Sequence, residues 1–184
     1  MIEKPYTLIL DLDETLGHFN QQKQQFVQRP YLQEFLNDLS KFYELIIFTA
    51  GIKEYADQTV TEFDKNKLIQ HKLYRQHCQI QGLVYIKDLS RVGRDLKKTI
   101  ILDNNHHNFQ QQPDNAIFVK SWFDDKEDDE LLFLKKILIS KIFIQYYQLK
   151  NIIEIAESKT KDVRKSLQKY RDFIVRQISQ QKNI

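Results

Sequence analysis

Two aspartates, Asp11 and Asp13, follow directly on the apolar run Leu8-Ile9-Leu10 in the segment LILDLDETL. The apolar run is typical of a buried strand, so both carboxylates are expected at the edge of a hydrophobic core. A buried carboxylate is costly unless it is paired, hydrogen-bonded or bound to a metal. The chemistry of the chain therefore depends on what compensates these two charges.

Three further polar side chains follow apolar segments later in the chain. Asp103 ends TIILD, Thr49 ends ELIIFT beside the backbone amides of TAG, and Lys87 follows LVYI. Mg²⁺ prefers oxygen ligands such as carboxylates and commonly binds a substrate phosphate as well. A hydroxyl and backbone amides suit a phosphate oxygen, and a lysine adds a positive charge. This set favours phosphoryl transfer with Mg²⁺, which needs neither histidine nor cysteine.

The pattern between these residues predicts the elements that would bring them together. Short apolar segments predict strands at residues 6–12, 43–51, 72–78, 83–89, 99–105 and 115–123. Helical spacing predicts helices at 29–41, with Pro30 in the first turn, and at 53–65, while the Gln-rich segment 17–28 predicts a loop or short hairpin. Such alternation predicts an α/β fold with a mostly parallel sheet covered on both faces. Ligands bind at the carboxyl ends of the strands in such sheets, which is where the polar side chains fall.

The C-terminal part of the chain differs in character. Residues 127–184 contain no glycine or proline and predict helix, and residues 141–184 carry ten lysines and arginines against four acids. We therefore expect a domain at 1–140 and a helical basic extension at 141–184. The extension has an apolar stripe made of Val163, Leu167, Tyr170, Ile174 and Ile178. Such a stripe packs either on its own domain or on a partner protein; we expect the former up to about residue 150 and the latter beyond it.

Composition narrows the class of protein. The chain has 184 residues, of which 41% are hydrophobic and 29% charged, as in soluble globular proteins. Its net charge of +3 does not indicate nucleic-acid binding, and the lack of a long apolar run predicts no membrane span. Because the first strand is predicted to begin at residue 6, we expect no signal peptide before it. Cys78 is the only cysteine, which suits a reducing intracellular compartment: nucleus or cytoplasm, or alternatively the mitochondrion.

The ordered motifs resemble those of the haloacid-dehalogenase superfamily. Within it, the chain resembles the small phosphatases related to those of the RNA polymerase II carboxy-terminal domain, the NLI-interacting-factor-like or Dullard-type family with its FCP1 homology domain. The matching segments are DLDETL (11–16), RPYLQEFL (29–36), FTAG with KEYAD (48–57), YIKDLSRVGRDLKK (85–98), ILDNN (101–105) and PDNAIFVKSWFDD (113–125). The resemblance implies a Rossmann-like haloacid-dehalogenase fold without a large cap domain, followed by the helical extension.

The same resemblance implies catalytic roles. Asp11 would be the nucleophile that forms an aspartyl-phosphate, and Asp13 the acid that protonates the leaving oxygen and then activates water. Covalent catalysis of this kind divides a difficult hydrolysis into two steps. Thr49 and Lys87 would hold the phosphoryl oxygens. These roles agree with the chemistry that the residue types favour.

The resemblance also implies ligands for the metal and the substrate. Mg²⁺ would be bound by Asp11, the backbone carbonyl of Asp13 and Asn104, with Asp103 in support. Arg75 corresponds to a substrate-contacting arginine of the family, and Tyr55 to a residue of the pocket wall.

One departure from the family bears on specificity. Its members have a longer segment after DLDETL, which forms a hairpin that reads proline beside the phosphoserine, whereas only residues 17–28 occupy that place here. We therefore expect little selectivity for proline.

Three functions remain open on the sequence. The leading hypothesis is a Mg²⁺-dependent phosphatase of phosphoserine and phosphothreonine in proteins. A second is a phosphatase-like fold retained as a structural or interaction subunit of a larger assembly, reached through the C-terminal helices. A third, a small-molecule phosphatase, is disfavoured because small metabolites usually require a lid.

Overall fold

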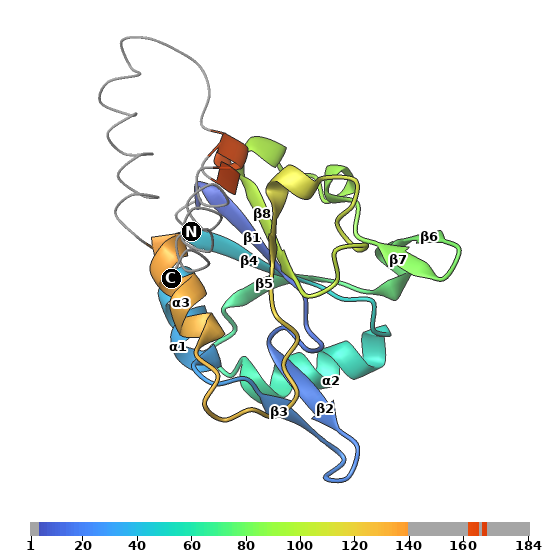
Figure 1. Ribbon diagram of the computed structural model, residues 1–184, viewed down its shortest axis with the longest axis vertical. Coiled ribbons are helices and arrows are strands. Elements are labelled where there is room, and N and C mark those ends of the chain that lie inside the picture. The colour runs from blue at the N-terminus through green and yellow to red at the C-terminus, as the bar shows by residue number, and fades with distance from the viewer. Residues whose placement is uncertain (1–3, 140–161, 166, 169–184) are drawn as a thin grey trace, which may run out of the picture.

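The computed structural model describes residues 4–139, 162–165 and 167–168 (Figure 1). Its centre is a five-stranded sheet in the order β5-β4-β1-β8-β9, in which every adjacent pair is parallel. The strands are β1 (Tyr6–Leu10), β4 (Tyr43–Phe48), β5 (Ile69–Leu73), β8 (Thr99–Asp103) and β9 (Ala116–Phe118). The predicted parallel sheet is confirmed.

Both faces of this sheet are buried, which explains why its strands are almost continuously apolar. Alternate residues of β1 point to opposite faces, so Leu8 and Leu10 join one hydrophobic cluster and Ile9 joins the other. The larger cluster is covered by α1 (Leu32–Leu39), α2 (Lys53–Phe63) and α3 (Glu130–Ile139). Loops and short 3₁₀ helices cover the smaller cluster. The buried thiol of Cys78 belongs to this cluster. Among the described residues, α-helices therefore pack on one face only.

The predicted helices form, but their ends differ from the prediction. Pro30 lies before α1 instead of in its first turn, because Tyr31 adopts a left-handed conformation (φ 65°) at the N-cap. In α1 the buried residues Leu32, Phe35, Leu36 and Leu39 follow helical spacing.

The predicted strand at residues 72–78 is wrong in its extent. Strand β5 begins at Ile69 and ends at Leu73, and Arg75–His77 form a 3₁₀ helix, η1. A two-stranded hairpin follows, with β6 (Gln79–Gln81) antiparallel to β7 (Val84–Ile86). The sequence pattern fails here because Tyr74 and Cys78 are buried without being part of a strand.

The segment after β1 forms the short hairpin that was one of the two predicted alternatives. Strand β2 (Gly17–Asn20) pairs antiparallel with β3 (Gln25–Gln28). It projects from the domain beside α2 (Figure 1). Two short hairpins are the only additions to the main sheet in the described part of the chain, so a large cap domain is absent from residues 4–139.

Two residues of the predicted apolar stripe pack on the domain. Val163 and Leu167 are buried in the cluster that also contains α3. This packing contradicts the expectation that everything beyond residue 150 serves a partner. Tyr170, Ile174 and Ile178, and the helix predicted through residues 140–161, lie outside the described residues. Within the described residues, no helix has the length and hydrophobicity needed to cross a membrane.

Because Leu167 is only 1% exposed, Leu167→Ala should remove buried methyl groups and lower the free energy of unfolding by about 2–5 kcal/mol. Urea denaturation of the full chain measures this change. Lys165→Ala, at an exposed position of the same segment, serves as the control and should stay within about 0.5 kcal/mol. Equal stability of the two variants would show that the segment does not pack on the domain.

Candidate active site

The site lies where the topology of the sheet reverses. From the central strand β1, the chain passes to β4 on one side, and β8 later pairs with β1 on the other side. In open α/β sheets this switch point leaves a crevice at the carboxyl ends of the strands. Asp11 follows β1 directly, and its backbone N–H donates to the carbonyl of Leu102 in β8 at 2.9 Å.

A buried lysine compensates the first aspartate. The ammonium group of Lys87 is fully buried and donates both to Asp11 Oδ1 and, at 2.6 Å, to Asp103 Oδ2. Thr15 Oγ1 donates to the other oxygen of Asp11 at 2.8 Å. The charge of Asp11 is thus balanced by a protein cation.

This cluster contains two carboxylates and one ammonium group, and its ionisation reflects both burial and charge. Burial and, to a smaller extent, the Asp103 carboxylate raise the pKa of Asp11, the Lys87 ammonium lowers it, and the net pKa is about 7. Burial opposes the charge of Lys87, but the carboxylates of Asp103 and Asp11 outweigh it and raise the lysine pKa above its ordinary value. Lys87 therefore stays positively charged.

Asp103 is held as a support for Lys87. Its Oδ1 accepts from the backbone N–H of Asn105 at 2.8 Å, and both of its oxygens accept from Asn108 Nδ2 at 3.1 and 3.2 Å. The backbone N–H of Lys87 donates to the carbonyl of Asn108 at 2.6 Å. Asn108 thus fixes the lysine at its backbone and its carboxylate partner together.

The second aspartate has a different environment. Tyr55 Oη donates to Asp13 Oδ1, and Thr49 Oγ1 lies 3.5 Å from Asp13 Oδ2. Burial raises the pKa of Asp13, while the hydrogen bond from Tyr55 lowers it. The ring of Tyr55 packs edge-on against Phe19 of the β2 strand, with centroids 5.9 Å apart. Tyr55, predicted on the pocket wall, therefore contacts the carboxyl group of Asp13.

Thr49 is placed by the turn that follows β4. Its backbone N–H donates to the carbonyl of Leu73, and its Oγ1 accepts from the backbone N–H of Gly51 at 2.8 Å. A Cβ at Gly51 would lie 3.1 Å from Thr49 Oγ1 and 3.3 Å from the ring of Tyr55. Glycine therefore permits the close approach of this turn to both side chains.

Two of the predicted metal ligands, Asp11 and Asn104, lie close together. Asn104 Nδ2 donates to Ser121 Oγ at 2.9 Å, and Thr15 Oγ1 lies 2.8 Å from Asp11 Oδ2 and 3.4 Å from Asn104 Oδ1. One hydroxyl thus reaches both oxygens, which fits a shared hard cation. In the part of the chain that the structure describes, no three His, Cys, Asp or Glu side chains form a metal cluster. A Mg²⁺ site needs fewer carboxylates, since the ion usually keeps waters and phosphate oxygens.

The candidate residues lie around a hollow of about 250 Å³. Its lining includes Asp11, Asp13, Thr49, Asn104, Leu83 and Tyr85. Arg75 is exposed at the rim, where its guanidinium group lies over the ring of Tyr85 at 5.1 Å and its Nε donates to the carbonyl of Ala50 at 2.7 Å. The structure therefore gathers the predicted residues at one edge of the sheet, with Lys87 and Asp103 beneath the hollow.

Comparison with models of known protein families finds a match over most of the chain. The family model of NLI interacting factor-like phosphatases matches residues 6–151. The chain belongs to this family. Its structure resembles fission yeast RNA polymerase II CTD phosphatase Fcp1, in an R271A form bound to beryllium fluoride, with a TM-score of 0.72 and 19% identity over 89% of this chain and 70% of that one. This likeness confirms the predicted haloacid-dehalogenase fold.

Several relatives are similar to this chain in sequence. CTD small phosphatase-like protein 3 of Caenorhabditis elegans is 43% identical over 148 residues, 70% of this chain and 52% of the relative. Human carboxy-terminal domain RNA polymerase II polypeptide A small phosphatase 2 is 37% identical over 145 residues, 69% and 54% of the two chains. Subunit TIM50 of the Kluyveromyces lactis mitochondrial import inner membrane translocase is 37% identical over 136 residues, 72% and 28%. The chain thus spans about half the length of the first two relatives.

Arg29 is a buried residue whose role in this NLI interacting factor-like domain the sequence analysis missed. It is 1% exposed and forms two hydrogen bonds of 2.7 Å with the carboxylate of Asp128. Its Nη1 donates to the carbonyls of Thr15 at 3.2 Å and Lys120 at 2.9 Å. Thr15 contacts Asp11, and Lys120 precedes Ser121, which holds Asn104. One guanidinium group therefore ties the loop that carries Asp11 and Asp13 to the loop whose Ser121 accepts from Asn104.

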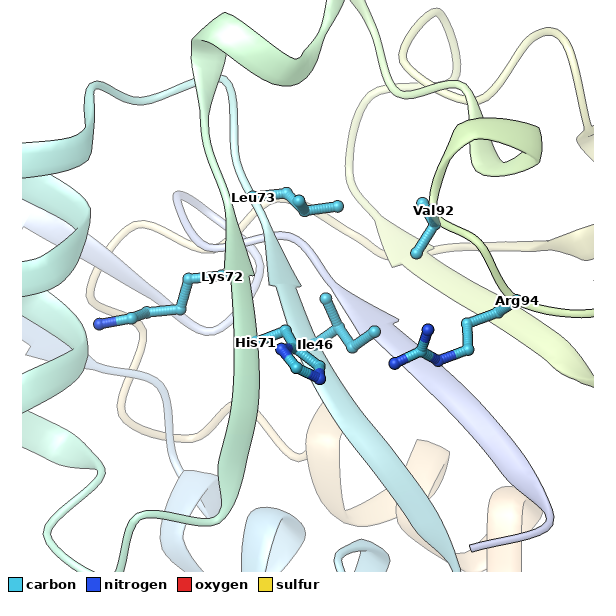
Figure 2. Close-up of a pocket in the computed structure, with 6 residues that line it drawn as sticks. All are labelled: Ile46, His71, Lys72, Leu73, Val92 and Arg94. Carbon is cyan, nitrogen blue, oxygen red and sulfur yellow. The ribbon is translucent and has the colours of Figure 1, made fainter. Parts of the chain in front are cut away.

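A second hollow of about 250 Å³ lies away from these residues (Figure 2). It is lined by Ile46, His71, Lys72, Leu73, Val92 and Arg94. Arg94 Nε and Nη2 each donate to the carboxylate of Glu44 at 2.7 Å. His71 Nε2 lies 3.4 Å from the same carboxylate. Lys72 points away from the hollow and pairs with Asp57 of α2. The charged groups at this hollow form ion pairs within the protein, so we assign no catalytic role to it.

Replacing Arg29 by methionine removes the guanidinium group that donates to Asp128 and to the carbonyls of Thr15 and Lys120. Arg29→Met should therefore lower the free energy of unfolding by about 3–5 kcal/mol, as expected for breaking a buried ion pair. Denaturation of the full chain in urea measures this loss.

Arg94→Met is the matched control, because Arg94 forms the same two-bonded pair with Glu44 but is 36% exposed. Its loss should be about 1 kcal/mol or less. If both variants lose the same free energy of unfolding, the buried Arg29 pair contributes no more to stability than the exposed Arg94 pair.

Proposed function

We propose that this chain is a Mg²⁺-dependent phosphatase that removes phosphate from phosphoserine and phosphothreonine in proteins. The main support is the arrangement of Asp11, Asp13 and Thr49 in one hollow, with the charged Lys87 beneath Asp11. Membership of a phosphatase family and relatives named as phosphatases add further support.

In the first step, a carboxylate oxygen of Asp11 attacks phosphorus, and the bond between phosphorus and the serine or threonine oxygen breaks. The leaving oxygen takes a proton from Asp13, whose pKa is raised by burial. General acid help of this kind contributes about 10²–10⁴-fold. Lys87 and the hydroxyl of Thr49 stabilise negative charge on the phosphoryl oxygens.

In the second step, water attacks the aspartyl-phosphate and Asp13 takes a proton from it. The bond between Asp11 and phosphorus breaks, inorganic phosphate leaves, and both aspartates return to their starting states. A Mg²⁺ ion held by Asp11, Asn104 and the carbonyl of Asp13 would neutralise charge on the phosphate. Asp103 takes no part in bond formation, since it is fully buried beneath the hollow and supports Lys87.

The open site favours a protein substrate. Residues 4–139 contain no cap domain that could close over a metabolite, so the substrate itself must help to exclude water. A phosphoserine or phosphothreonine on a peptide segment can do so, because the flanking residues cover the rim.

A second function has one observation in its favour. A relative with 37% identity is named as a mitochondrial import translocase subunit, TIM50. The same fold in this chain would then serve as a structural or interaction subunit. An assembled set of Asp11, Asp13, Thr49 and Lys87 favours the phosphatase instead.

An assay with an aryl phosphate and a phosphoserine peptide tests the proposal. The wild-type chain should hydrolyse both with Mg²⁺ and stop on chelation, because the phosphoryl charge needs the cation. Asp11→Asn should reduce both activities to background. Asp13→Asn should lose about 10²–10⁴-fold on the peptide but much less on the aryl phosphate, whose good leaving group needs little protonation.

Asp38→Asn is the control for these substitutions, because Asp38 pairs with Lys41 and Lys135 on the surface of α1. It should keep full activity. Turnover by folded Asp11→Asn would refute the nucleophile, and equal losses of Asp13→Asn on both substrates would refute the acid. A wild-type chain that hydrolyses neither substrate would favour the subunit function.

A further inference from the structure

The β6–β7 hairpin carries exposed apolar side chains at the edge of the catalytic hollow. It projects from the domain on the side away from α1 and α3 (Figure 1). Leu83, in the turn, is 99% exposed, and Ile80 in β6 is 70% exposed. Single exposed apolar residues are ordinary, but Leu83, Val84 and Tyr85 also line the hollow that contains Asp11. Any substrate that places its phosphate there must pass beside them.

The hairpin is held firmly to the domain. Gln79 Nε2 donates to Asp88 Oδ2 at 2.9 Å, and Gln111 Nε2 donates to Gln79 Oε1 at 2.9 Å. Gln110 Nε2 donates to Gln81 Oε1 at 3.1 Å. These amide contacts come from both ends of β6, so the strand presents its apolar side chains from a fixed support.

The pairing of the strands decides which side chains share a face. Ile80 lies directly opposite Tyr85, and directly opposed residues of an antiparallel pair project to the same face. The guanidinium group of Arg75 lies over the ring of Tyr85. This face therefore combines an aliphatic residue and an aromatic ring with a cation, and Leu83 extends it at the turn.

We propose that Leu83 and Ile80 bind a large apolar residue that lies one to three positions from the phosphoserine or phosphothreonine of the substrate. This inference rests on the proposed function and names a substrate class for the same site. Leu83 itself lines the hollow, and an extended peptide advances about 3.3–3.6 Å per residue, so only near neighbours of the phosphorylated residue reach it. Burying one aliphatic side chain is favourable enough to produce a difference in affinity of about tenfold.

Because the β2–β3 hairpin is short, the β6–β7 hairpin offers the larger apolar contact for a substrate at the hollow. It places Phe19 against Tyr55, and it has only four residues in each strand. The β6–β7 hairpin offers a different apolar surface on the hollow, so the preference it generates is for large aliphatic residues in general and not for proline.

The test measures binding, so that it does not depend on turnover. Fluorescent phosphoserine peptides with leucine or alanine at each of the three positions on either side are titrated against the Asp11→Asn chain with Mg²⁺. The leucine peptide should bind at least about tenfold more tightly at one of these positions, as expected for one apolar side chain in a pocket. In Asp11→Asn chains that also carry Leu83→Ser, or Leu83→Ser with Ile80→Ser, the ratio should fall below about threefold.

Phe133→Ser is the matched control, because Phe133 is another exposed apolar residue, 43% exposed and on α3. It should leave the leucine-to-alanine ratio unchanged. A ratio below threefold at every position, or a tenfold ratio that survives both hairpin substitutions, overturns the inference. Absence of hydrolysis by the wild-type chain would refute the proposed catalysis alone, because the binding ratios are measured without it.

Discussion

Burying the ammonium group of Lys87 is costly by itself, and the carboxylates of Asp11 and Asp103 offset that cost by contacting it from the ends of two neighbouring strands. The arrangement also solves the problem of Asp11, whose charge would otherwise lie unpaired at the edge of the core. Strand register makes it feasible, because Leu10 of β1 lies beside Leu102 of β8. The two aspartates that follow these residues are therefore side by side.

The surrounding structure maintains this cluster. Asn108 holds the backbone of Lys87 and the carboxylate of Asp103, and Arg29 holds the carbonyls of Thr15 and Lys120. Such fixed polar contacts allow charges to stabilise a transition state without first reorienting. The two hairpins lie outside this rigid centre and contribute side chains to its rim. In our proposals, catalysis therefore uses residues at the strand ends, and substrate preference uses the β6–β7 hairpin.

The sequence was sufficient to predict the sheet and the edge at which the candidate residues gather, because buried parallel strands read as apolar runs and their polar ends must meet at one edge. It could not predict the partners of Lys87, which depend on a contact with Asp11 across 76 positions. Arg29 was missed for the same reason, since Asp128 lies 99 positions away. The boundary at Leu73 was missed because a buried residue outside a strand, such as Tyr74, looks locally like part of one.

The most direct test of the account is to identify the residue that becomes phosphorylated during turnover. The wild-type chain, mixed with an aryl phosphate and Mg²⁺, is quenched and reduced with borohydride, which converts an aspartyl-phosphate to homoserine, and its peptides are then sequenced by mass spectrometry. The account predicts homoserine at position 11, with Asp13 unchanged, because only Asp11 is both in the hollow and held by Lys87. Homoserine at position 13, or turnover with no modified aspartate, would contradict it.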